Sequence, residues 1–209
     1  MQSKKLKVTR TAHYYCLGNE KNPKNIWFVL HGYGYLASKF IKYFETLDSK
    51  NNLIIAPEGL SYFYINGVNG KVGASWMTKE HREDEIEDYI NYLNKLYNHF
   101  LKSHPNASVN ILGFSQGGAT ASRWLMNNKI KCNHFILWAS VFPDDVTIEF
   151  PRCSNIFIIK GSKDEYVSEE RFETLEKILI SKKLNYKKIV FEGKHIIDKE
   201  TLLKLEKII

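Results

Sequence analysis

A serine stands between two glycines in the stretch Gly113-Phe114-Ser115-Gln116-Gly117, directly after an apolar run and before a run of small residues. A serine hydroxyl becomes a nucleophile when a base takes its proton, and that base needs an orienting acid. At this spacing the serine would sit on a sharp strand-to-helix turn, where glycines let the helix pass close to the strand. The pattern predicts that Ser115 is a nucleophile if the rest of the chain supplies its partners.

An acid and a histidine must then follow the serine, each just after a later strand. Asp164 comes after the apolar run of residues 155–161, and His195 comes after the run of residues 187–193. An aspartate in such a place is commonly only a turn residue, and a single histidine is commonly structural. Because three residues meet three positional demands in the right order, the sequence predicts a catalytic triad of Ser115, Asp164 and His195.

Acyl transfer also needs N–H donors for the oxyanion of the tetrahedral intermediate. We expect one from the backbone of Gln116, directly after the nucleophile, and the other from the backbone of Tyr33, in the loop after an earlier strand. His31 precedes the serine at the end of that strand, so we interpret it as structural support for the loop. The aromatic candidates for a substrate pocket, each with core packing as its alternative, are Tyr35, Tyr62, Phe63, Trp76 and Phe142.

The residues that position these groups form short apolar runs that alternate with amphipathic segments. The predicted strands cover residues 26–30, 52–56, 108–114, 134–140, 155–161 and 187–193. They are apolar almost throughout, which is typical of parallel strands that are covered on both faces. Residues 8–16 are more mixed and indicate edge strands. The sequence therefore predicts an α/β fold with a mainly parallel central sheet and helices on both faces.

Apolar residues at helical spacing predict helices across residues 40–47, 86–100, 172–179 and 202–205. Thr78 is the expected N-cap of the second helix, and the acidic residues after it suit the positive end of a helix dipole. We interpret the charge run of residues 79–88 as a solvated helix face rather than a metal site. Residues 57–78 show no regular pattern and are expected to form a long loop that walls a pocket.

The composition limits the kinds of partner and the cellular location that we expect for the protein. The 209 residues are 44% hydrophobic and 25% charged, as in ordinary soluble domains. The net charge is +7, but only five of the 30 basic residues are Arg and the lysines are scattered, so no nucleic-acid partner is expected. Three separated cysteines without a C-x-x-C pair suit a reducing cytosol. Without a signal peptide or a long apolar run, we expect a cytoplasmic protein with no membrane span.

Five segments, in chain order, carry a resemblance to a known family: HGYG, GASWM, GFSQGG, GSKDEYV and GKHIID. They resemble the small carboxylesterase, phospholipase and acyl-protein thioesterase branch of the α/β-hydrolase superfamily. The serine segment is the most specific, and the resemblance spans about residues 26–195. It implies the same triad and oxyanion donors, and no cofactor. The length of the chain predicts one domain, so we expect a single α/β-hydrolase domain over residues 1–209, and we expect no metal site.

This chain departs from the family pattern at two places near the expected acyl pocket. Family members usually carry an aspartate shortly after the His-Gly-x-Gly segment, where this chain has Tyr35. The family's Trp-aromatic-Asp box appears only as Trp76-Met77-Thr78. These differences concern the substrate class rather than the chemistry.

The predicted reaction is a two-step transfer of an acyl group from a small carboxylic ester or thioester to water, through an acyl-enzyme intermediate. A serine peptidase or an acyltransferase could use the same triad, and both stay open as alternatives. A non-catalytic binding protein on a hydrolase fold predicts the loss of a triad residue, and none is lost. The sequence carries no signal of the oligomeric state.

Overall fold

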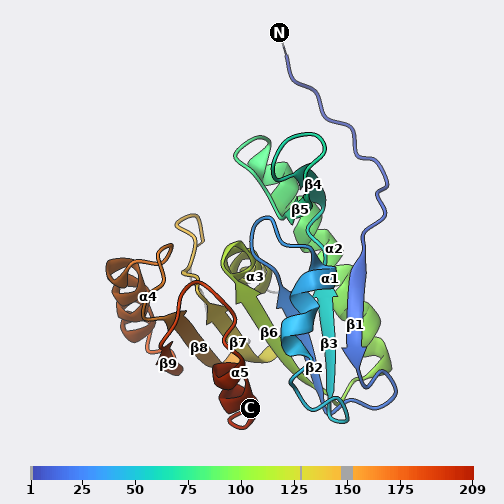
Figure 1. Cartoon of the computed structure of the whole chain (residues 1–209). Coiled ribbons are helices and arrows are strands. Elements are labelled where there is room, and N and C mark those ends of the chain that lie inside the picture. The colour runs from blue at the N-terminus through green and yellow to red at the C-terminus, as the bar shows by residue number, and fades with distance from the viewer. Residues whose placement is uncertain (1, 128, 147–152) are drawn as a thin grey trace.

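The computed structural model describes residues 2–127, 129–146 and 153–209. Within them, a seven-stranded sheet runs in the order β1-β3-β2-β6-β7-β8-β9 (Figure 1). All neighbouring strands are parallel except β1, which is antiparallel to β3. The predicted mainly parallel sheet is thus confirmed. The strands are β1 (Tyr14–Gly18), β2 (Asn25–Leu30), β3 (Asn52–Pro57), β6 (Ser108–Phe114), β7 (Cys132–Trp138), β8 (Cys153–Gly161) and β9 (Tyr186–Phe191).

Helices cover both faces of the sheet, as predicted. One face packs against α2 (Arg82–Ser103), α3 (Gln116–Met126) and α4 (Glu169–Ser181). The other packs against α1 (Ala37–Phe40), the 3-10 helix η1 (Ile41–Phe44) and α5 (Lys199–Glu206). Successive strand residues alternate between the two cores: Ile111 of β6 joins the first and Leu112 joins the second. This explains why the strands are apolar throughout.

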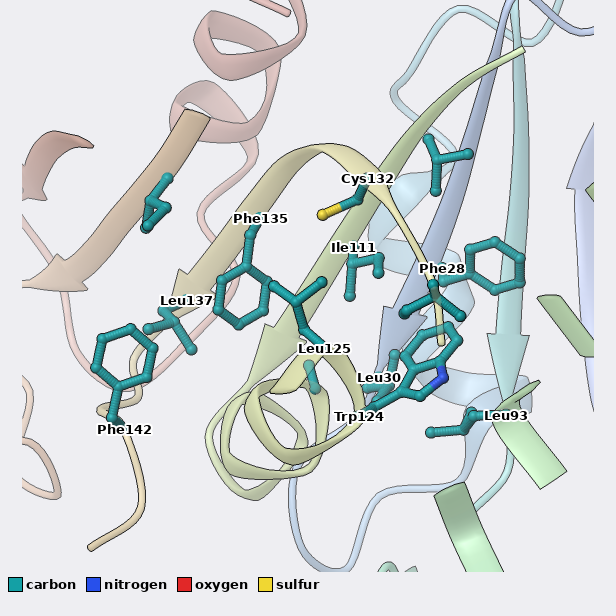
Figure 2. Packing of buried hydrophobic residues seen from close by; sticks show 14 of the residues in the cluster. Phe28, Leu30, Leu93, Ile111, Trp124, Leu125, Cys132, Phe135, Leu137 and Phe142 are labelled. Carbon is teal, nitrogen blue, oxygen red and sulfur yellow. The ribbon is translucent and has the colours of Figure 1, made fainter. Parts of the chain in front are cut away.

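The first core is built around large aromatic side chains between α2, α3 and the sheet (Figure 2). Trp124 of α3 packs the edge of its indole against Phe28 of β2, with 5.6 Å between the ring centroids. Its indole N–H donates to Oδ1 of Asn94 in α2 at 3.0 Å. A buried indole is stable because its single donor is satisfied. These contacts hold α3 against the strand that it follows.

Residues 2–13 form an arm without regular structure that extends away from the sheet (Figure 1). The predicted edge strand is therefore confirmed only from Tyr14 onward. Lys5 pairs with Asp84 at 2.6 Å and Lys7 pairs with Glu87, both on α2. The charge run of residues 79–88 therefore meets these two lysines of the arm.

The helix predicted over residues 40–47 and the start of the long helix differ from the sequence prediction. The stripe of residues 40–47 forms α1 and then η1, which ends at Phe44. A turn follows, in which the Asp48 carboxylate accepts from the Lys50 N–H and the Asn51 side chain. The prediction that Thr78 caps the long helix is wrong. That helix begins at Arg82, while the Glu85 carboxylate instead accepts from the N–H and hydroxyl of Thr78.

The segment of residues 57–78, predicted to be a structureless loop, contains an antiparallel hairpin of β4 (Ser61–Tyr64) and β5 (Val72–Ser75). Each strand is only four residues long, which is too short for a clear periodic pattern in the sequence. The hairpin pairs with the loop after β2, through Gly34 N–H to Ala74 O at 2.9 Å and Ala74 N–H to Tyr35 O at 3.3 Å. The hairpin is therefore fixed to the loop after β2 by backbone hydrogen bonds.

Two adjacent residues of α4 test how much burial in the core contributes to the free energy of unfolding. Leu179 is 0% exposed and Ile180 is 59% exposed. Leu179→Ala is expected to lower the free energy of unfolding by about 2–5 kcal/mol, because it removes transfer free energy and leaves a cavity. Ile180→Ala, the matched control, should change it by less than about 0.5 kcal/mol. Urea unfolding measures both, and equal losses would contradict the packing described.

Candidate active site

Ser115 stands at the junction of β6 and α3 in a strained backbone conformation, with φ 54° and ψ −120°. For a residue other than glycine this costs on the order of 1–3 kcal/mol, so the surroundings must hold it. The Ser115 N–H donates to Trp138 O at 3.0 Å. Its carbonyl accepts from the Gly118 N–H at 2.9 Å and from Ser140 Oγ at 2.8 Å. The serine is thus held on a sharp elbow at the carboxyl end of the sheet.

The flanking glycines are required by close packing. A Cβ on Gly113 would lie 2.4 Å from Gly117 O, and a Cβ on Gly117 would lie 2.2 Å from Leu30 O. No real side chain tolerates such contacts, so any larger residue would push α3 away from β6 and β2. The predicted reason for the two glycines is confirmed.

Asp164 follows β8 and His195 follows β9, and the structure brings the two together. Nδ1 of His195 lies 2.9 Å from Oδ2 of Asp164. The carboxylate is 0% exposed and the imidazole 14% exposed. Oδ1 of Asp164 also accepts from the N–H groups of Tyr166 and Val167, each at 2.9 Å. Because the carboxylate accepts, the imidazole carries its proton on Nδ1, and Nε2 is free to act as a base.

Trp138, at the end of β7, connects the serine elbow to the histidine loop. Its carbonyl accepts from the Ser115 N–H at 3.0 Å, and its indole N–H donates to Ile196 O at 2.9 Å. The His195 ring lies 4.8 Å from the Phe114 ring, centroid to centroid. His195 is thus held beside the residue that precedes the serine. Trp138 was not among the residues predicted from the sequence, although its position at a strand end was a signal.

Two backbone N–H groups are available for an oxyanion. Gln116 is the first residue of α3, where N–H groups have no acceptor within the helix. In the loop after β2, the N–H groups of Gly34 and Tyr35 donate to Ala74 O and Gly32 O, while that of Tyr33 donates to no group in the described part of the chain. A Cβ on Gly32 would lie 3.2 Å from Ser115 Cβ, so this loop lies beside the serine.

His31 supports the loop after β2, as predicted. Its Nε2 accepts from the Gly59 N–H at 2.9 Å, so Nδ1 carries the proton and donates to Gly32 O at 2.8 Å. Burial lowers the pKa of His31 to about 4. The ring is therefore neutral at physiological pH. It also lies 3.7 Å from Glu58, whose pKa is raised by burial.

The side chain of Gln116 also contributes to the site, whereas the sequence predicted a role only for its backbone N–H. Its Oε1 accepts from the Trp76 N–H at 3.2 Å, and its Nε2 donates to Met77 O at 2.9 Å. The Trp76 indole N–H in turn donates to His31 O at 2.9 Å. The amide of Gln116 thus connects the serine elbow, through Trp76, to the loop that carries Tyr33.

The five pocket candidates take different places. Trp76 and Phe142 are buried in the first core, at 1% and 6% exposed. Tyr35 packs its ring against Phe114, with 6.1 Å between the centroids. Phe63 stacks on the exposed Tyr33 ring at 4.9 Å.

The remaining candidate, Tyr62, is 48% exposed and alternates with Phe63 along β4, so it faces the opposite side of the hairpin. Phe63 therefore lies beside Tyr33 in the loop after β2, whereas Tyr62 faces away from it.

Across residues 2–127, 129–146 and 153–209, no cluster of three His, Cys, Asp or Glu side chains could hold a metal ion. In the same residues, no helix is both long and apolar enough to cross a bilayer.

The strand order and the elbow at the carboxyl end of the sheet define an α/β-hydrolase fold. The sequence profile of the phospholipase and carboxylesterase family matches residues 16–209, and the chain belongs to that family. The protein is accordingly an ester hydrolase, in agreement with the resemblance found in the sequence. Among curated proteins there is no match.

Solved structures share this fold. A carboxylesterase from Mesorhizobium loti aligns with a TM-score of 0.76 at 17% identity, over 94% of this chain and 93% of its own. The Bacillus cereus carboxylesterase aligns at 0.72 and 17% identity, over 94% and 92%. Acyl-protein thioesterase 2 from Zea mays aligns at 0.70 and 15% identity, over 95% and 97%. At such identities the likeness establishes the fold.

The neutral His31 predicts a pH dependence of stability. Its pKa is about 4 in the folded protein and 6.5 ordinarily, so the unfolded chain binds a proton first as the pH falls. This contribution to stability is present above pH 6.5 and is lost toward pH 4. Urea unfolding at pH 7.5 and 4.5 should show about 2 kcal/mol more loss for the wild type than for His31→Gln. Glu58 titrates in both proteins, so equal losses would contradict the assignment.

Proposed function

We propose that the protein is a serine hydrolase that cleaves the ester or thioester bond of small acyl substrates with Ser115, His195 and Asp164. One observation carries the proposal: the buried Asp164 carboxylate holds Nδ1 of His195 at 2.9 Å, at the edge of the sheet where Ser115 sits on its elbow. Family membership supplies the class of bond. The continuity of both cores through one sheet supports a single domain.

In the first step, Nε2 of His195 takes the proton of Ser115 Oγ as that oxygen attacks the acyl carbonyl. Asp164 keeps the proton on Nδ1 and stabilises the imidazolium as it forms. The imidazolium then protonates the leaving alcohol or thiol, and the acyl group stays on Ser115. Water repeats the path with His195 as its base, which releases the acid and frees the serine.

The N–H groups of Tyr33 and Gln116 are the proposed oxyanion donors, each contributing on the order of 3 kcal/mol to transition-state stabilisation. The Tyr33 loop is fixed by hydrogen bonds to Ala74, and Gln116 is fixed at the start of α3, so these N–H groups need little reorganisation during the reaction. Among the pocket candidates, Phe63 stacks on Tyr33, and Tyr35 packs on Phe114 beside the serine. We propose them as contacts for the substrate.

Substitution of the nucleophile tests the proposal. Ser115→Ala should lose labelling by a fluorophosphonate probe and at least about 10⁴-fold of kcat/KM on p-nitrophenyl acetate and butyrate. Asp164→Asn should lose about 10⁴-fold in kcat because the tautomer is wrong. Ser181→Ala, on the exposed end of α4, is the matched control and should match the wild type. Labelling or turnover that survives in Ser115→Ala would refute the triad.

The Gln116 amide predicts a separate effect on the oxyanion donors. Gln116→Ala and the similarly sized Gln116→Met keep the backbone N–H but lose the bonds to Trp76 and Met77. Both should lower kcat by about 10- to 100-fold with KM within about twofold, because the donors become misplaced. Steady-state kinetics on p-nitrophenyl butyrate measure this. Normal kcat in Gln116→Met would show that only the volume of the side chain matters.

A further inference from the structure

Two cysteines face each other across neighbouring strands at the end of the sheet opposite to the elbow. Cys132 is the first residue of β7 and Cys153 the first of β8, and they are register partners in this parallel pair. Neighbouring strands lie about 4.8 Å apart, which falls within the range of about 4.4–6.8 Å for the Cα atoms of a disulfide. Register partners point to the same face of the sheet. Both thiols are free.

Both cysteines line one cavity of about 460 Å³, together with polar groups from Lys131, Asn133 and Ser154. Cys132 is 6% exposed, and its thiol lies among the side chains of the first core (Figure 2). Cys153 is half-buried. A small solute in the cavity can therefore reach the half-buried Cys153 more readily than the buried Cys132.

The two thiols are not equivalent. The interaction between the two thiols raises the pKa of Cys132, which burial raises further, and lowers the pKa of Cys153. As a thiol, Cys153 donates to Asn155 O at 3.0 Å. Burial raises the pKa of the third cysteine, Cys16, to about 11. Since the thiolate is the nucleophile, Cys153 is the more reactive member of the pair.

We propose that Cys132 and Cys153 form a dithiol site that hydroperoxides oxidise to an intramolecular disulfide. The Cys153 thiolate attacks one peroxide oxygen, the O–O bond breaks, and Cys153 becomes a sulfenic acid with release of water or an alcohol. The Cys132 sulfur then attacks the Cys153 sulfur, the S–O bond breaks, and a second water leaves. With hydrogen peroxide, two S–H groups and one peroxide give one S–S bond and two waters.

The wild-type chain tests this with hydrogen peroxide, followed by N-ethylmaleimide and mass spectrometry. Before oxidation three thiols should be alkylated. After it one should be, and non-reducing proteolysis should yield a peptide that links Cys132 to Cys153. The pair should react about tenfold faster than Cys16, because more of Cys153 is thiolate, an advantage reduced by its weaker nucleophilicity. Loss of all three thiols at one rate, or no linked peptide, would overturn the proposal.

Single variants separate the two roles. Cys132→Ala should stop at the sulfenic acid, which dimedone traps on Cys153, whereas Cys153→Ser should leave Cys132 reduced. Cys16→Ser is the matched control and should form the disulfide at the wild-type rate. Dimedone capture on Cys132 in the Cys153→Ser variant would reverse the roles and overturn the proposed order. These readouts do not depend on hydrolase activity, so they stand or fall apart from the proposed function.

Discussion

The close approach of α3 to β6 and β2 is the constraint on which the rest of the site depends. It requires glycine at 113 and 117, since a Cβ at either would lie within 2.4 Å of a backbone oxygen. The chain can enter a helix this close to the strand only through a sharp turn, and Ser115 takes the strained backbone of that turn. The strain is held by hydrogen bonds to β7 and to Ser140, so the serine is presented by packing rather than by local preference.

Two tryptophans connect the serine elbow to the neighbouring loops. Trp138 uses its carbonyl for the elbow and its indole for the histidine loop. Trp76 is held by the Gln116 amide and holds the carbonyl of His31. A rigid indole with one donor suits both tasks, because burial requires that the donor be paired and so specifies a single position. The serine elbow, the histidine loop, the loop after β2 and the segment of Trp76 are thereby fixed relative to one another.

Most of the fold could be predicted because the buried strands and the amphipathic helices have local patterns. The strand over residues 108–114 was predicted to the residue, and the stripes of α4 and α5 face the core. Prediction from the local pattern failed where contacts with residues elsewhere in the chain determine the structure. Thr78 looked like a cap, but Glu85 takes its N–H, and the short strands of the hairpin depend on pairing with the loop after β2.

The sequence by itself determined the order of serine, aspartate and histidine and their places after successive strands, because both follow from chain order and local hydrophobic pattern. Only the tertiary structure decided that Asp164 and His195 are bonded, that the N–H of Tyr33 has no acceptor among the described residues, and that Cys132 lies opposite Cys153. These relations depend on the register between strands and on which side chains meet across it. Register comes from the packing of the whole sheet, which no local stretch of sequence encodes.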